Sequence, residues 1–89
     1  GIIADEPIAQ GASASAVNAA LAGFVRAAAC ELPRGIRINL VSPTMLAESA
    51  AAYGAFFPGF ESVPASRAAL AFRRSVEGIQ SGQVFKVGY

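Results

Sequence analysis

Few residues in this sequence could do chemistry, and the stretch Ser42, Pro43 and Thr44, with its two hydroxyls, is the most informative. They directly follow the apolar, partly β-branched run 36–41, which is typical of a strand buried on both faces. In open parallel α/β sheets, ligands bind beyond the carboxyl ends of the strands. We therefore expect these three residues to lie beside a ligand crevice, unless they form a simple turn after the strand.

Other candidate side chains stand alone. Tyr53 has a phenol that could act as an acid or base, but nothing in the sequence holds it near a reaction partner, and a packed aromatic explains it as well. Cys30 lies in an apolar stretch, which favours a buried small hydrophobe over a nucleophile. Phe56, Phe57 and Phe60 could line an apolar pocket, or pack in a core or a subunit interface.

The first element that must position these residues is a helix, predicted over 14–32. Its apolar residues recur at three- and four-residue spacings, and Ser13 or Ser15 could cap its start. Arg26 and Glu31 are its only charged residues. A helix without a polar face is buried on several sides, and one sheet covers only one side. We therefore expect a second partner for this helix.

The remaining elements alternate in type. After the strand 36–41, a short helix is expected within 45–53 and a longer one over 65–77, with Pro64 in its first turn and Ser62 as a nearby cap. Val84–Val87 is a final strand. The apolar positions of the longer helix are supplied by Leu70, Phe72, Val76 and Ile79, and its polar face by Arg67, Arg73 and Arg74. This alternation predicts an α/β fold with a parallel sheet.

Composition narrows the function. The 89 residues are 54% hydrophobic and 15% charged with a net charge of +1, which excludes disorder and gives nucleic acid no basic surface. The sequence has no histidine and one cysteine, so neither a usual zinc site nor an intrachain disulfide is expected. A lone cysteine fits a reducing, cytoplasmic location. No apolar run approaches the length of a membrane span.

Two segments carry a family resemblance. The run Ser13-Ala-Ser-Ala-Val-Asn-Ala-Ala-Leu-Ala-Gly-Phe-Val-Arg26, followed by Glu31-Leu-Pro-Arg-Gly-Ile-Arg-Ile-Asn-Leu-Val-Ser-Pro43, resembles the C-terminal half of short-chain dehydrogenases/reductases. The run Ser81-Gly82-Gln83-Val84-Phe85-Lys86-Val87 is similar to the last strand of that family and its approach. The closest likeness is to a compact, atypical subgroup in which Phe56-Phe57-Pro58-Gly59-Phe60 also recurs.

The resemblance implies the C-terminal portion of a Rossmann-type doubly wound parallel sheet, with residues 1–89 as a fragment of a single domain. It implies an NAD(P)-dependent oxidoreductase, with Asn18, Ser42, Pro43 and Thr44 beside the NAD or NADP. The Gly-rich loop that would hold the cofactor phosphates is not in this sequence. The family also dimerises across the helix that corresponds to 14–32, so the resemblance implies a homo-oligomer. The substrate would be a small molecule, with no nucleic acid or membrane partner.

The sequence departs from the family at the catalytic residues. The family's tyrosine and lysine align with Ala14 and Asn18, and its serine with Gly1. None of these three can transfer a proton in the reaction, so no catalytic residue of the usual kind is expected. Asn18 could still hydrogen-bond a ribose, since an amide both donates and accepts, or simply be satisfied by its surroundings. Three possibilities remain: an oxidoreductase with a degenerate site, a non-catalytic NAD(P)-binding or regulatory protein, and an inactive assembly unit.

Overall fold

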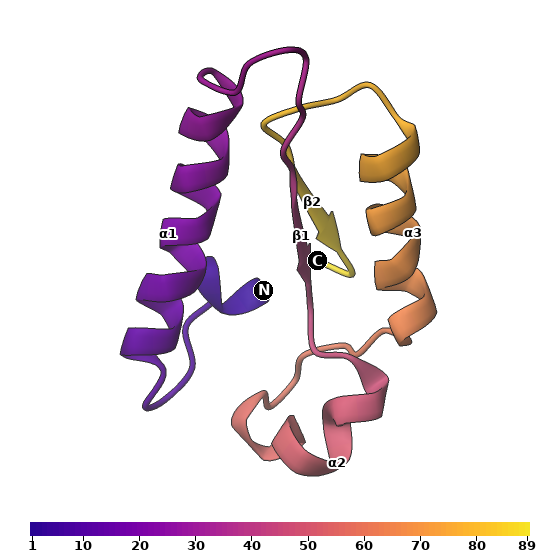
Figure 1. Cartoon of the computed structure of the whole chain (residues 1–89). Coiled ribbons are helices and arrows are strands. Elements are labelled where there is room, and N and C mark those ends of the chain that lie inside the picture. Colours follow the sequence, from indigo (N-terminus) through magenta and orange to yellow (C-terminus); the bar gives the residue numbers. More distant parts are fainter.

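The computed structural model describes residues 1–89, which form two parallel strands between helices. The 3₁₀-helix Ile2–Ala4 precedes α1, and two further 3₁₀ turns, Ala47–Ser49 and Gly54–Phe56, flank α2. Figure 1 shows α1 and α3 on opposite sides of the strands, with α2 beyond the end of β1. The elements in chain order are α1 (Ala12–Ala29), β1 (Leu40–Pro43), α2 (Ala50–Tyr53), α3 (Ala65–Glu77) and β2 (Val84–Val87).

The sheet consists of β1 and β2, paired in parallel with Leu40 opposite Val84 and Pro43 opposite Val87. Parallel strands need a long crossover connection, and here α3 supplies it. The predicted α/β class with a parallel sheet is thus confirmed. The predicted strand over 36–41 begins too early, because its partner strand starts only opposite Leu40, and it also ends too early, since Ser42 and Pro43 are the last two residues of β1. Ile36 is nearly half exposed, and the Asn39 side chain hydrogen-bonds Gln80 and Gln83 in the loop before β2.

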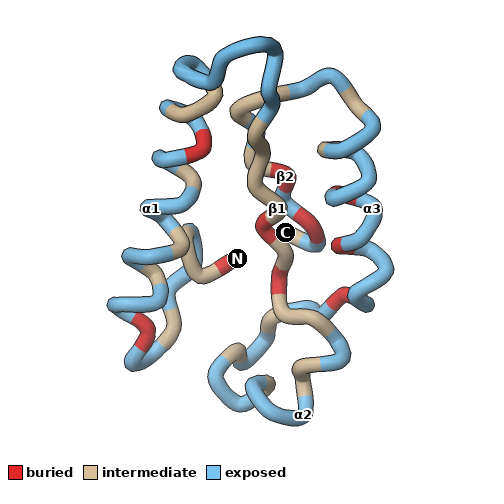
Figure 2. Tube along the Cα trace, viewed as in Figure 1, coloured by how far each residue is buried: buried red, intermediate tan, exposed pale blue.

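The core lies between α3 and the sheet. Val63, Ala71, Phe85 and Val87 are buried together, with Val41 packed against them. Figure 2 shows how few residues are buried: ten of the 89. The helix α3 approaches the strands through its alanines, which are the residues short enough to allow close contact. The large apolar residues of α3 and of the turn after it are therefore not in the core: Leu70, Phe72, Val76 and Ile79 are 60–93% exposed.

The ends of α3 match the predicted range 65–77, but its cap differs. Ser62 does not cap the helix; both carboxylate oxygens of Glu48 accept from the N–H of Ala65, at 3.0 and 3.1 Å. At the other end, the Arg37 guanidinium donates to the carbonyls of Val76 at 2.9 Å and Gln80 at 3.2 Å, and also to that of Ser75. Both partners come from segments far away in the sequence.

The helix α1 is less covered than expected. It begins after Gly11 without a side-chain cap, so the capping prediction for Ser13 and Ser15 is wrong. Val25 is its only buried residue, and Cys30 just beyond its end is exposed, contrary to prediction. Large apolar side chains remain open on it: Val17, Leu21 and Phe24. No helix in the structure combines the length and apolar character needed to cross a membrane.

Candidate functional site

A cavity of about 220 Å³ opens where β1 ends, and we refer to it as the strand-end cavity. It brings together three of the four residues expected beside the cofactor, Asn18, Pro43 and Thr44, although Asn18 comes from α1. The other lining residues are Gly1, Ile2, Ile3, Met45 and Phe57. No charged side chain lines it, so the cavity suits a flat, uncharged group.

The polar side chains of the strand-end cavity are already paired. The Asn18 Oδ1 accepts from the Gly1 amine at 2.6 Å, and the Asn18 Nδ2 donates to the Ala14 carbonyl at 2.8 Å. The Thr44 hydroxyl donates to the Glu61 carbonyl at 2.9 Å. Burial lowers the pKa of the Gly1 amine, and the charge of nearby Asp5 opposes this shift.

Two backbone groups at the same place are free. Neither the N–H of Met45 nor the carbonyl of Thr44 makes a hydrogen bond within the chain. The two groups belong to one trans peptide, which directs them to opposite sides, so a ligand in the cavity can reach only one of them. An amide-bearing ligand could pair with either group, because an amide offers both an acceptor and a donor.

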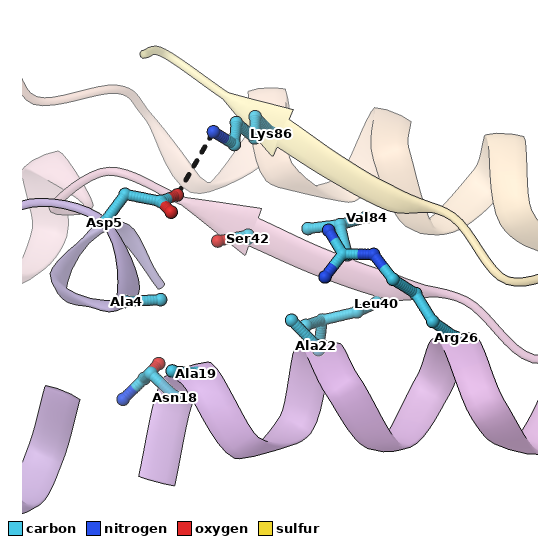
Figure 3. Close-up of a pocket in the computed structure, with 10 residues that line it drawn as sticks. All are labelled: Ala4, Asp5, Asn18, Ala19, Ala22, Arg26, Leu40, Ser42, Val84 and Lys86. Atoms are coloured by element: carbon cyan, nitrogen blue, oxygen red, sulfur yellow. Dashed lines mark ion pairs between the residues drawn. The ribbon is translucent and has the colours of Figure 1, made fainter. Parts of the chain in front are cut away.

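Ser42 lies on a different side of β1 from its neighbours. Its hydroxyl is 2% exposed and lies 2.5 Å from the Tyr89 hydroxyl. Successive residues of a strand point to opposite faces, so Ser42 and Pro43 do not share a cavity. Figure 3 shows Ser42 facing a cavity of about 170 Å³ between α1 and the sheet, beside the ion pair of Lys86 with Asp5 at 3.1 Å.

The positions of the family's catalytic residues lie together. Gly1 contacts Asn18, and Asn18 contacts Ala14 one helical turn away. The chemistry is missing even though the geometry is present, since none of the three side chains can transfer a proton. Ser13 is exposed, and the Ser15 hydroxyl is buried without a hydrogen-bond partner. Neither serine lines the strand-end cavity.

A second, apolar cavity of about 430 Å³ adjoins the strand-end cavity. The two share Ile3, Met45 and Phe57 in their linings, so they lie side by side. Tyr53 lines this apolar cavity. The sequence could not reveal this position, because residues of α1 and α2 line the same cavity only in the folded chain. The complete lining is Ile3, Ile8, Ala14, Met45, Leu46, Ser49, Tyr53, Phe56 and Phe57. Phe60 lies outside it and packs edge-on against Phe57, with ring centres 5.5 Å apart.

The fold and the strand-end cavity define an α/β unit whose candidate site lies at the carboxyl end of a parallel strand. This unit superposes on the crystal structure of the protein lin1944 from Listeria innocua with a TM-score of 0.95 and 50% sequence identity. The match covers 98% of this chain and 44% of lin1944, so the chain spans less than half the length of that protein. No protein-family model matches the sequence, and no curated protein matches it.

Proposed function

We propose that these residues belong to an NAD(P)-dependent oxidoreductase of the short-chain dehydrogenase/reductase type, built on a Rossmann-type sheet, and form the wall beside its nicotinamide. One observation carries the proposal. At the carboxyl end of a parallel strand, the peptide group between Thr44 and Met45 has no hydrogen-bond partner within the chain and borders a cavity without charged side chains. This is where ligands of such sheets bind.

The residues fit one end of the cofactor. A nicotinamide carboxamide can accept from the Met45 N–H, while Phe57 and Pro43 offer apolar contact to the ring. They do not fit the pyrophosphate, since no lysine or arginine side chain lines the cavity and no Gly-rich loop follows a strand. Other residues of the intact protein must hold the phosphates. When bound, NAD(P) supplies hydride transfer, and these residues orient the ring and exclude water.

The active site is degenerate under this proposal. Ala14, Asn18 and Gly1 cannot supply the proton that carbonyl reduction requires, and general acid–base help is worth roughly 10²–10⁴ in rate. The alternative is a non-catalytic NAD(P)-binding or regulatory protein. It is supported by the same three residues, because a chain without a proton donor can bind the cofactor and still not reduce a carbonyl. The third possibility, an assembly unit only, predicts no cofactor binding at all.

Cofactor titration tests the proposal. NADH and NADPH fluorescence should change on binding to the full-length product of the gene. Met45→Pro removes the N–H that the carboxamide would accept from, and one hydrogen bond is worth about 1 kcal/mol, so the Kd should rise roughly fivefold. Met45→Leu keeps the N–H and is the control. If neither nucleotide binds, the oxidoreductase and the NAD(P)-binding proposals both fail.

A turnover assay separates the two proposals that remain, the oxidoreductase and the non-catalytic NAD(P)-binding protein. Oxidation of NADH or NADPH in the presence of a panel of aldehydes and ketones would indicate an enzyme, and binding without turnover would indicate the non-catalytic alternative. We also propose a cytoplasmic homo-oligomer that associates through α1. Its exposed Val17, Leu21 and Phe24 form the apolar surface that a second copy would cover.

A further inference from the structure

The apolar cavity next to the strand-end cavity has the size of a small-molecule site. Its volume of about 430 Å³ falls within the 300–1,000 Å³ common for ligand pockets. Three separate parts of the chain build it: the segment before α1, the first turn of α1, and the stretch from Met45 to Phe57. It is therefore a product of the fold and not a gap within a single loop.

The lining determines the class of ligand. Eight of the nine residues are hydrophobic and none is charged. A carboxylate or phosphate placed there would lose its hydration without gaining a partner, which is costly. The hydroxyls of Ser49 and Tyr53 are the only polar side-chain groups on the wall, so the cavity can satisfy a ligand with one or two neutral polar atoms.

The position of Ala14 connects this cavity to the departures from the family. Ala14 stands on its wall, where the resemblance would place a tyrosine, and its methyl group leaves space that a larger side chain would fill. The cavity also shares Ile3, Met45 and Phe57 with the lining of the strand-end cavity. A ligand held there has one end beside the proposed nicotinamide position.

We infer that the apolar cavity binds the substrate of the proposed oxidoreductase, and that this substrate is a small, uncharged, predominantly apolar carbonyl compound or the matching alcohol. The reaction named in this inference rests on the proposed function. The class of ligand rests on the lining of the cavity alone. Ala14 is the specificity-determining residue, because its size sets how much of the cavity the ligand can use.

Calorimetric titration of the full-length product, with oxidised cofactor present to prevent turnover, tests this inference. Acetophenone serves as the neutral apolar probe and benzoate as a charged probe of similar size. Acetophenone should bind at least about tenfold more tightly than benzoate. Ala14→Phe should weaken acetophenone binding by at least about tenfold, which is about 1.4 kcal/mol. Ala16→Phe places the same ring on an exposed position of α1 and should change nothing.

Benzoate binding as tight as acetophenone, or no acetophenone binding, would overturn the inference. So would unchanged binding in a folded Ala14→Phe variant, and the wild-type comparison of the two probes decides the matter if that variant does not fold. The NADH titration is read separately. Cofactor binding without acetophenone binding refutes the substrate class and leaves the oxidoreductase proposal standing. Acetophenone binding that depends on Ala14 but occurs without any cofactor binding refutes the oxidoreductase proposal and leaves the ligand class standing.

Discussion

Replacing Arg37 by alanine should destabilise the protein more than any other single change of an exposed charge. The Arg37 guanidinium donates to three carbonyls at the C-terminal end of α3 and in the turn beyond it, where carbonyls lack helical partners. It also places a positive charge at the negative end of the helix dipole. Without it, solvent alone must satisfy these groups, and α3 loses its tie to the segment that leads into β1.

The magnitude follows from these contacts. A hydrogen bond to a charged group contributes about 1.5–3 kcal/mol, and the exposure of Arg37 places it near the lower end even with three acceptors. The favourable dipole interaction adds about 0.3–1 kcal/mol. We expect a loss of about 2 kcal/mol in the free energy of unfolding. For a unit of this size that corresponds to a fall in Tm of roughly 8–16 °C.

Urea and thermal denaturation, followed by circular dichroism, measure this effect. Arg34→Ala is the matched control, because Arg34 is exposed in the same segment and makes no side-chain hydrogen bond or ion pair. Arg37→Lys should recover only part of the loss, because an ammonium group lacks the planar fork. If Arg37→Ala and Arg34→Ala lower the Tm equally, the cap contributes nothing and the reasoning is wrong.

Four further outcomes can be checked. Glu48→Ala removes the acceptor at the start of α3 and should lower the free energy of unfolding by about 1 kcal/mol in urea titrations; no loss would mean that solvent replaces the carboxylate. Ser15→Ala removes a buried hydroxyl without a partner, so stability should be unchanged or higher, and a clear loss would reveal a hidden hydrogen bond. Leu21→Glu puts a charge on the open face of α1 and should convert an oligomer to a monomer in light scattering, whereas an unchanged mass would exclude association through this face. Ala14→Tyr combined with Asn18→Lys should raise kcat for carbonyl reduction if cofactor binds, while raising the KM for acetophenone because the new ring occupies part of the apolar cavity; continued wild-type turnover insensitive to both positions would place the chemistry elsewhere.

Local signals predicted the elements well. Pro64 and Gly78 bracket α3, and its bounds agree with the prediction because both residues act on the adjacent backbone alone. The start of β1 could not be predicted in the same way, since a strand begins where its partner does, and that partner lies about forty residues away. The sequence also did not show which face of α3 packs against the sheet. Its large apolar residues suggest one side, yet the short side chains of Ala68 and Ala71 are what the sheet accepts.

The residues of the candidate site also differ in whether the sequence alone could predict them. Pro43 and Thr44 were predictable because the end of a strand is a local signal with a general meaning. Tyr53 was not, because its place on the apolar cavity depends on α2 folding back beside the segment before α1. The free N–H of Met45 left no trace in the sequence either, since every residue except proline has one and only the completed structure shows which are unpaired.

The pairing of β1 with β2 has a consequence for the order of folding. Leu40 meets Val84 at a sequence separation of 44 residues, and closing a loop of that length costs about 3 kcal/mol of entropy before any ladder bond forms. Each strand has only four residues with which to recover that cost. The helix α3 shortens the loop when it forms first, because it replaces flexible chain with a rigid segment that packs on Phe85 and Val87. The strands should therefore pair late, after α3 has formed.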